Sequence, residues 1–483
     1  MWKRRLLPTL LLLALTGVGL HARTPYLLAW RAALPWIFLG IGGLAAWKYR
    51  RLRVTALLLL LASSIPSALQ YRATTQKEGV LVSDPQILQR LGRHFIVGYR
   101  NDAEIESLVK RGAIGGIFIT QRNIQGKSAA QVRAEIAHWQ NIQASLGLPP
   151  LYIATDQEGG RVSRLSPLVP ALPSLAEWRK LRPVSEYAAL QAASLVDLGV
   201  NLNFSPVVDL KLPGQADFLQ PHTRLSERAL SGDPEEVAAV AADYCAAFDR
   251  FGLRCTLKHF PGLGRVRADT HLSEGELNVS PAQLEKEDWI PFRQVLQSTP
   301  AFLMIGHVRV PELDPDAPAS LSRPIVQGLI RETWGHEGIV VTDDFTMGPI
   351  AGRSGGVGRA AVDAIDAGVD LILISYDGEL YYEAMAELLS SHAQGNLDVA
   401  MLRKSDARLG ADFDRRTGGD QSPDLFDLGV ADRNAAVGPI ISPLQGAEIR
   451  HAVGQTVDHD GTACGQTLPT CALPVPGAGI RDM

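Results

Sequence analysis

Residues 151–162 read LYIATDQEGGRV. The first half of this stretch is an apolar run that predicts a buried β-strand, and the second half is a polar, glycine-rich turn. A parallel strand buried on both faces has this continuous apolar character. The stretch therefore predicts an α/β protein that carries polar groups where its strands end.

Seven more runs of this kind occur along the chain, and amphipathic helical patterns separate them. Eight β/α units favour a (β/α)8 TIM barrel. A doubly wound open sheet is the alternative, but no glycine-rich dinucleotide fingerprint follows the first strand. The predicted strands are 94–99, 113–120, 151–156, 200–209, 255–260, 301–308, 338–345 and 370–375, and the clearest helices are 129–145, 185–198, 234–251, 281–297, 324–334, 358–367 and 378–391.

Composition divides the 483 residues into three parts. Residues 1–71 are apolar apart from short basic clusters, 82–412 resemble an ordinary globular domain, and 413–483 are rich in Gly and Pro without periodicity. We expect a membrane-anchoring segment, a catalytic barrel and a disordered tail. The net charge of −4 and the dispersed Lys and Arg residues argue against nucleic acid as a partner.

The anchoring segment contains three apolar stretches, 6–20, 26–47 and 54–69. Basic clusters precede the first stretch and separate the second from the third, and both belong on the cytoplasmic side by the positive-inside rule. Three crossings would leave the barrel outside the cytoplasm, on the periplasmic side. A cleaved signal peptide is the alternative, and Arg31 leaves open whether the second stretch spans or lies at the interface.

Four cysteines are too few for a disulfide scaffold and lack the spacing of a zinc site. Cys464 and Cys471 could pair in an oxidising compartment.

Polar clusters follow the third, fifth, sixth and seventh predicted strands, at 156–161, 258–262, 306–308 and 342–345. The active site of a barrel enzyme lies at the carboxyl ends of its strands. Of the adjacent acids Asp343 and Asp344, one should face the centre of the rim and the other support a loop; capping a helix is the structural alternative. In the Asp269-Thr270-His271 element an acid can orient an imidazole for acid/base chemistry, although such pairs are often structural.

These motifs together resemble glycoside hydrolase family 3, in its β-N-acetylglucosaminidase branch. The resemblance covers residues 82–412. It is carried by DQEGGRV at 156–162, KHFPGLG at 258–264, DTH at 269–271 and TDD at 342–344, with supporting elements at 228–234 and 367–370.

The resemblance implies a retaining hydrolase that releases N-acetylglucosamine from the non-reducing end of a muropeptide or related glycan. Asp343 would be the nucleophile, and His271, polarised by Asp269, the acid/base. No metal or organic cofactor is implied. The sugar would be held by Asp156, Arg164, Arg228, Lys258 and His259.

The sequence departs from the family pattern at Leu263 and Arg265, where relatives often have His and Asp, and this leaves the closure of the loop in doubt. A family 3 β-glucosidase, an N-acetylglucosaminide phosphorylase and an inactive sugar-binding barrel remain alternatives. Members of this branch are commonly cytoplasmic, which the predicted spans contradict.

Overall fold

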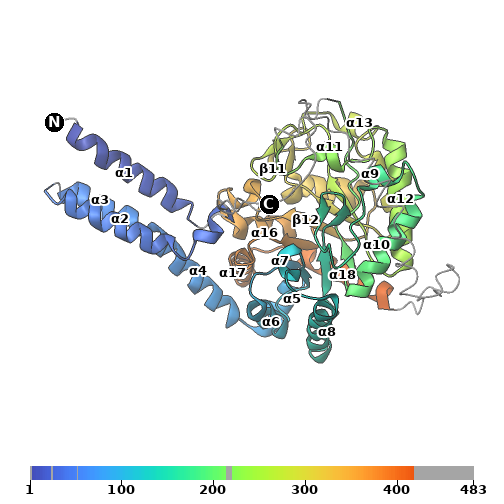
Figure 1. Cartoon of the computed structure of the whole chain (residues 1–483), viewed down its shortest axis with the longest axis horizontal. Coiled ribbons are helices and arrows are strands. Elements are labelled where there is room, and N and C mark those ends of the chain that lie inside the picture. Colours follow the sequence, from blue (N-terminus) through green and yellow to red (C-terminus); the bar gives the residue numbers. More distant parts are fainter. Residues whose placement is uncertain (1–2, 23–24, 52, 214–219, 418–483) are drawn as a thin grey trace, which may run out of the picture. The chain divides into compact units, whose positions relative to one another are not determined.

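The computed structural model describes residues 3–22, 25–51, 53–213 and 220–417, and its centre is a nearly closed barrel of eight parallel strands (Figure 1). The order is β6-β3-β2-β1-β13-β12-β9-β7, and parallel bridges from Leu202 to Arg254 and from Val207 to Lys258 join the two ends. The open-sheet alternative is therefore wrong. The strands are β1 Phe95–Gly98, β2 Gly116–Phe118, β3 Tyr152–Thr155, β6 Leu202–Asn203, β7 Thr256–Phe260, β9 Phe302–Ile305, β12 Val340–Asp344 and β13 Leu371–Ile374.

Helices surround the strands and bury a large apolar layer against them, while a second, smaller cluster that includes Ile96, Phe118 and Phe302 fills the barrel interior. The helix predicted at 129–145 has these bounds in the structure. The main outer helices are α6 Asp102–Lys110, α8 Ala129–Ser145, α10 Val184–Leu198, α12 Pro234–Arg250, α14 Ile290–Ser298, the π-helix η4 Pro324–Thr333, α16 Gly356–Ala367 and α17 Leu380–Ala393.

The helix predicted at 281–297 is broken into α13 Pro281–Leu284 and α14. Trp289 is buried between the two pieces, and its indole N–H donates to the Pro261 carbonyl at 3.0 Å. Pro291, in the first turn of α14, lacks an amide hydrogen and suits a helix start. Tertiary packing of one indole therefore overrides the helical periodicity.

Shorter elements complete the barrel domain. A hairpin of β4 and β5 follows β3, and a small mixed sheet of β8, β10 and β11 lies near the end of β9. The shorter strands and helices are β4 Gln157–Gly159, β5 Val162–Ser163, β8 Gly275–Glu276, β10 Val308–Val310, β11 Asp314–Pro318, α5 Pro85–Gly92, α7 Gln121–Ile124, α9 Leu175–Trp178, α11 Leu225–Arg228, η3 Ala319–Leu321 and α15 Gly348–Ala351.

A further helix, α18 Val399–Thr417, packs at the amino ends of the strands. Asp412 accepts hydrogen bonds from the Tyr152 hydroxyl at 2.8 Å and from Arg254 Nε at 3.0 Å. Arg408 pairs with Asp370 at 2.8 Å. The predicted boundary at residue 412 thus falls inside this helix, and the rest of the predicted tail, 418–483, lies outside the described residues.

The N-terminal segment is helical, with α1 Lys3–Leu20, the 3-10 turn η1 Pro25–Trp30, α2 Leu34–Lys48, α3 Arg53–Ser63 and α4 Ile65–Leu81. By length and composition one described helix, Arg53–Leu81, could cross a membrane, and 7–20 and 34–48 form shorter apolar helices. The second apolar stretch is therefore not one continuous helix, because the chain turns at Arg31, whose side chain binds acids of the barrel.

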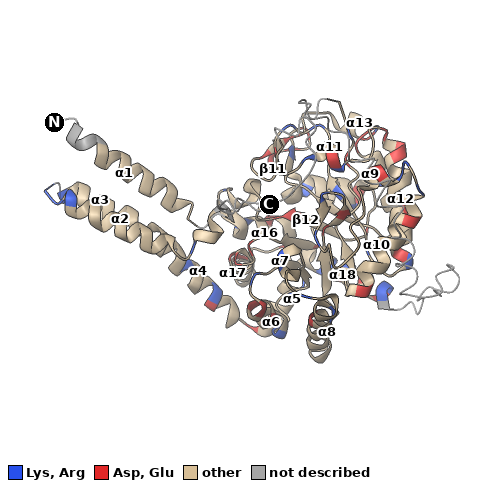
Figure 2. Cartoon of the chain, in the orientation of Figure 1, with Lys and Arg blue, Asp and Glu red and all other residues tan. Residues whose placement is uncertain are grey.

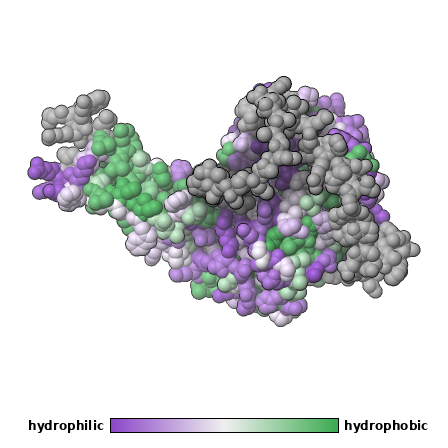
Figure 3. Space-filling model, viewed as in Figure 1, coloured by the Kyte–Doolittle hydropathy of each residue, from purple (hydrophilic) through white to green (hydrophobic). Residues whose placement is uncertain are grey.

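Helices α1, α2 and α3 pack on one another through a small core that contains Leu15, Phe38 and Leu59. A Cβ atom at Gly42 would lie 2.2 Å from Ser63 Oγ, so glycine is what allows α2 to approach so closely. Outside this core, large apolar side chains are exposed on all three helices (Figure 3).

A disulfide joins Cys245 in α12 to Cys255, the residue before β7. Both are buried. The pair considered from the sequence, Cys464 and Cys471, lies outside the described residues.

Candidate active site

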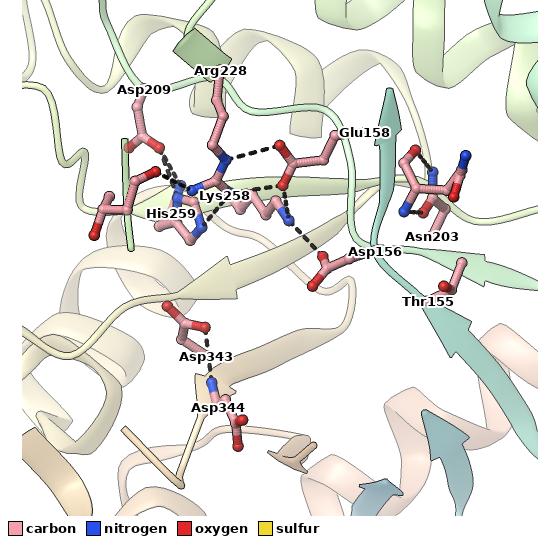
Figure 4. A network of polar contacts seen from close by, with 12 residues as sticks. Thr155, Asp156, Glu158, Asn203, Asp209, Arg228, Lys258, His259, Asp343 and Asp344 are labelled. Carbon is pink, nitrogen blue, oxygen red and sulfur yellow. Dashed lines mark hydrogen bonds and ion pairs between the residues drawn. The ribbon is translucent and has the colours of Figure 1, made fainter. Parts of the chain in front are cut away.

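A buried cation, Lys258, organises the polar residues at the carboxyl ends of β3 and β7 (Figure 4). Its Nζ donates to Asp156 Oδ1 at 2.7 Å and pairs with Glu158 Oε1 at 2.7 Å. The side chains of Lys258 and Glu158 are 3 % and 7 % exposed, whereas that of Asp156 is 26 % exposed. Of the two acids held by the lysine, Asp156 is therefore the one with open carboxylate surface.

Arg228, at the end of α11, makes a two-pronged contact with Glu158, with Nε–Oε2 at 2.9 Å and Nη2–Oε1 at 2.7 Å. Burial alone would raise the pKa of Glu158, but attraction from Arg228 and Lys258 holds that pKa well below its ordinary range. Glu158 is thus an anion between two cations, in bidentate geometry that favours a single arginine orientation.

Asn203, the last residue of β6, holds the segment that carries Asp156 and Glu158 by hydrogen bonds to its backbone. Asn203 Oδ1 accepts from the Gln157 amide and Asn203 Nδ2 donates to the Gln157 carbonyl, both at 2.9 Å. The side-chain amide of Asn203 thus replaces the backbone hydrogen bonds that a neighbouring strand would make, just beyond the end of β3.

His259 is held by Asp209, a carboxylate that follows β6. Asp209 Oδ2 accepts from His259 Nδ1 at 2.8 Å and from the His259 amide at 3.1 Å, and Asp209 Oδ1 accepts from the Leu263 amide at 2.6 Å. Asp209 therefore orients an imidazole and anchors the start of the following loop. Because the contact to Leu263 uses its backbone, the loop start is held without the family's histidine side chain.

The adjacent acids on β12 have different surroundings. Asp344 accepts hydrogen bonds from the Thr346 amide at 3.0 Å, the Thr346 hydroxyl at 2.6 Å and the Ser375 amide at 2.9 Å, and also from the Ser375 hydroxyl. Asp343 accepts from the backbone amide of Asp344 at 2.8 Å. The prediction that one acid supports a neighbouring loop describes Asp344, whose carboxylate is saturated with partners.

Asp343 lies among imidazoles. Burial by itself would raise its pKa, but attraction from three neighbouring rings holds the pKa below the ordinary value. The rings belong to His259, His307 and His271. A carboxylate kept ionised in this way suits a nucleophile.

His307 is fully buried near the end of β9. Its Nδ1 lies 2.8 Å from Ser320 Oγ and its Nε2 3.1 Å from the Asp344 carbonyl oxygen. Burial lowers the pKa of His307, against the opposing attraction of Asp343 and Asp344. This histidine supports the backbone of β12 beside Asp343.

Asp269 and His271 form the predicted pair, in the loop between β7 and β8. Asp269 Oδ1 lies 3.0 Å from His271 Nδ1, and the Thr223 hydroxyl contacts both atoms, at 3.0 and 3.2 Å. The His222 amide donates to Asp269 Oδ2 at 2.8 Å. Although burial opposes ionisation, these donors hold the pKa of Asp269 far below its usual range, so the imidazole rests on a fixed anion.

Arg265, where relatives often have Asp, pairs with Asp288 at 2.8 Å and also with Glu287. The loop that carries the Asp269–His271 pair is therefore tied to the segment before α14 by charge. An Asp at this position could not form either ion pair, so the tie depends on Arg265.

The structure brings most of the predicted site residues together. One network contains Asp156, Lys258, Arg228 and His259. Arg164 joins it only through its backbone, which donates to the Asp156 carbonyl at 3.3 Å, while its side chain is half-buried. Four further residues belong to the site although the sequence predicted no role for them: Glu158, Asn203, Asp209 and Thr223.

Two of these omissions had a signal in the sequence. Glu158 belongs to the DQEGGRV block, and Asp209 ends the fourth predicted strand, where a barrel places its functional groups. Thr223 had none, since its role depends on a contact across 46 residues. Among the described residues, no group of three or more His, Cys, Asp or Glu side chains could hold a metal ion.

Comparison with known proteins identifies the family of the chain. The chain is 33 % identical to a protein named beta-hexosaminidase from Tolumonas auensis over 284 residues, which covers 58 % of this chain and 80 % of that protein. A family 3 β-N-acetylglucosaminidase from Paenibacillus has a similar structure, with a TM-score of 0.62 and 31 % identity over 68 % of this chain and 62 % of that one.

A β-N-acetylhexosaminidase from Beutenbergia cavernae matches with a TM-score of 0.60 and 30 % identity, over 67 % of this chain and 98 % of that one. Residues 79–409 match the family described as Glycosyl hydrolase family 3 N terminal domain. The chain belongs to glycosyl hydrolase family 3.

Proposed function

We propose that this protein is a retaining β-N-acetylhexosaminidase that removes N-acetylglucosamine from the non-reducing end of peptidoglycan-derived or related glycans. The proposal rests on two observations: neighbouring imidazoles, including that of His271, lower the pKa of Asp343, and the buried Asp269 carboxylate holds His271 Nδ1 at 3.0 Å. The names of the similar proteins support the N-acetylhexosaminide as substrate.

In the first step Asp343 attacks the anomeric carbon while His271 gives a proton to the glycosidic oxygen. The bond from the anomeric carbon to this oxygen breaks, the leaving sugar departs as an alcohol, and a covalent glycosyl ester forms. Asp269 stabilises the protonated ring before the transfer, because its carboxylate is fixed against Nδ1. Nε2 is then the nitrogen that exchanges the proton.

In the second step water attacks the anomeric carbon and His271 accepts its proton. The ester bond to Asp343 breaks, which regenerates the carboxylate and retains the anomeric configuration. The same cycle with phosphate in place of water would give a sugar phosphate, so phosphorolysis is the second candidate reaction.

The network around Lys258 supplies the sugar contacts. Asp156 has exposed carboxylate surface for accepting from a diol, and Arg228, Lys258 and His259 place donors at the same rim. Arg164, whose side chain is half-buried, is a further donor to the sugar in this proposal.

The test is an assay of the full-length protein on p-nitrophenyl β-N-acetylglucosaminide and on the matching β-glucoside, each with and without phosphate. We expect release from the N-acetyl substrate alone, and free sugar as the product. Release from the glucoside would favour the glucosidase alternative, a phosphate-dependent sugar phosphate would indicate a phosphorylase, and inactivity on both would favour a binding role.

We further propose that the N-terminal helices anchor the enzyme in a membrane with the barrel outside the cytoplasm. Exposed apolar surface is concentrated on α1, α2 and α3, as at Trp36, Leu44 and Val54, which are 76 %, 71 % and 72 % exposed (Figure 3). A folded domain in water rarely leaves so much contiguous apolar surface uncovered.

The order of these helices supports three crossings. Arg31, between α1 and α2, binds the barrel, so α1 runs toward the barrel, α2 away from it and α3 back. The basic residues Lys48, Arg50, Arg51 and Arg53 then lie at the end of the bundle that is far from the barrel (Figure 2). Because α1 and α2 are shorter than the roughly 20 residues that a span needs, flanking side chains would have to reach the interfaces.

The Cys245–Cys255 disulfide is independent support for this location. Disulfides persist in oxidising compartments such as the periplasm and are rare in the cytosol.

A further inference from the structure

The contact between the membrane segment and the barrel is made at the catalytic rim. Arg31 is 5 % exposed, and its guanidinium bonds to Asp377 Oδ1 at 3.0 Å and to Glu379 Oε2 at 2.9 Å, with a second contact to Asp377 Oδ2. Asp377 is itself 1 % exposed. Both acids follow β13, so they belong to the end of the barrel that carries the site.

This rim loop is directly connected to the acids on β12. Two residues before Asp377, Ser375 donates its amide and hydroxyl to Asp344, the neighbour of Asp343. Since each residue extends the chain by at most about 3.6 Å, Ser375 and Asp377 have Cα atoms within about 7 Å of each other. Arg31 therefore contacts the loop that holds Asp344, the neighbour of the proposed nucleophile.

The residues next to Arg31 are those of a membrane interface. Trp30, in η1, is 61 % exposed, and Trp36, in the first turns of α2, is 76 % exposed. Tryptophan prefers the headgroup level of a bilayer, because its ring is apolar and its N–H is polar. In the proposed topology, the bilayer surface on the barrel side lies at the height of the η1 turn.

A second attachment restrains the barrel against this surface. The apolar helix Arg53–Leu81 continues into the barrel domain as one helix, and its α4 part packs against α17, the helix that follows the Arg31 contact. Val80 is buried in the main barrel core, and Lys77 pairs with Glu104. With two attachments beside one loop and a helix in place of a flexible linker, rotation of the barrel is restricted.

We propose that Arg31 positions the catalytic rim at the bilayer surface, so that the enzyme acts on lipid-linked saccharides with a terminal N-acetylglucosamine. This inference rests on the proposed function and specifies its substrate. Arg31 acts through the rim loop and is a positioning residue. A glycan anchored in the same bilayer presents its sugars close to the bilayer surface. An active site held at that surface can reach them.

The experiment uses the full-length protein in phosphatidylcholine vesicles, with chitobiosyl dialkylglycerol as the membrane probe and 4-methylumbelliferyl β-N-acetylglucosaminide as the soluble probe. Probe and enzyme are placed in the same vesicles or in separate ones. We expect at least tenfold faster release from the lipid probe in the shared bilayer. Arg31→Ala should lower that rate at least fivefold and leave hydrolysis of the soluble probe unchanged.

Asp377→Asn, which keeps the side-chain volume, should have the same effect and serves if Arg31→Ala fails to fold. The matched control is Arg254→Ala, which breaks another buried ion pair, with Asp412, at the opposite end of the barrel; it should leave the ratio of the two rates unchanged. Equal rates in shared and separate vesicles, or an unchanged ratio in both rim variants, would overturn the inference. Inactivity of the wild type on the soluble probe would instead refute the proposed function.

Discussion

At the scale of single residues, the two neighbouring acids of β12 have different roles: Asp343 is the proposed nucleophile, and Asp344 supports the structure. Neighbouring imidazoles lower the pKa of Asp343, whereas Asp344 accepts hydrogen bonds from Thr346 and Ser375. We expect Asp343→Asn to reduce kcat by at least about 10³-fold on aryl N-acetylglucosaminide with an unchanged Tm, because the nucleophile is lost. Asp344→Asn should lower the Tm, because a carboxylate with several donors becomes an amide.

Azide distinguishes loss of the nucleophile from loss of structure. In an Asp343→Ala variant azide should replace the missing carboxylate and restore turnover, with glycosyl azide as the product. It should not restore turnover to Asp344→Ala. Wild-type activity of Asp343→Asn would disprove the assignment.

Thr223 is a positioning residue for the Asp269–His271 pair, since its hydroxyl contacts both partners. Thr223→Val keeps the shape and removes one hydrogen bond, worth about 1 kcal/mol, so kcat/KM should fall about fivefold. With one donor fewer, Asp269 attracts the imidazole proton more strongly, and the alkaline limb of the pH–rate profile should move to higher pH. Thr223→Ser should restore both values; a drop in kcat/KM with an unmoved limb would indicate a merely structural role.

Glu158 should make stability depend on pH. Its pKa in the folded protein is lowered by Arg228 and Lys258 against the opposing effect of burial. Its ion pairs therefore stabilise the fold fully above the unfolded pKa of about 4.3, and this contribution is lost as the pH falls below that value. The Tm difference between wild type and Glu158→Gln should be constant from pH 5 to about pH 8 and shrink below about pH 4. A difference that grows on acidification would contradict the lowered pKa.

At the scale of elements, the disulfide ties α12 to the start of β7, the strand that carries Lys258 and His259. Closing a short loop of this kind stabilises a protein by about 2–3 kcal/mol. We expect a Cys245→Ala, Cys255→Ala variant to lose roughly 5 °C in Tm while its KM changes little. Reductant should lower the Tm of the wild type to a similar degree and leave the variant unaffected; an equal response of both would mean that the bond does not form.

At the scale of the whole molecule, the proposed topology places the barrel and the α2–α3 turn on opposite sides of the membrane. The test uses variants in which Cys245 and Cys255 are the only native cysteines and one further cysteine is introduced. A cysteine at the exposed position Leu146, in the barrel domain, should react with an impermeant maleimide in intact spheroplasts. A cysteine at Arg51, in the α2–α3 turn, should react only after permeabilisation. The reverse pattern would place the barrel in the cytoplasm.

Much of the fold could be predicted because it rests on local patterns. Eight apolar runs alternating with amphipathic helices identify β/α units from spacing alone, and all eight strands occur within the predicted ranges. Boundaries failed where a distant contact prevailed over local propensity. Buried Trp289 broke one helix, and the attraction of Asp377 for Arg31 divided an apolar stretch that reads as continuous.

The sequence by itself determined the class of fold, the family and the chemical groups of the site. These follow from the periodicity of apolar residues and from the order of the motifs, which can be read along the chain without knowing what surrounds each residue. Only the tertiary structure decided how these groups are paired: which acid of β12 is saturated with hydrogen bonds, that Glu158 lies between two cations, and that Cys245 meets Cys255. The physical reason is that ionisation, orientation and pairing depend on burial and on partners tens to hundreds of residues away, which spacing along the chain does not encode.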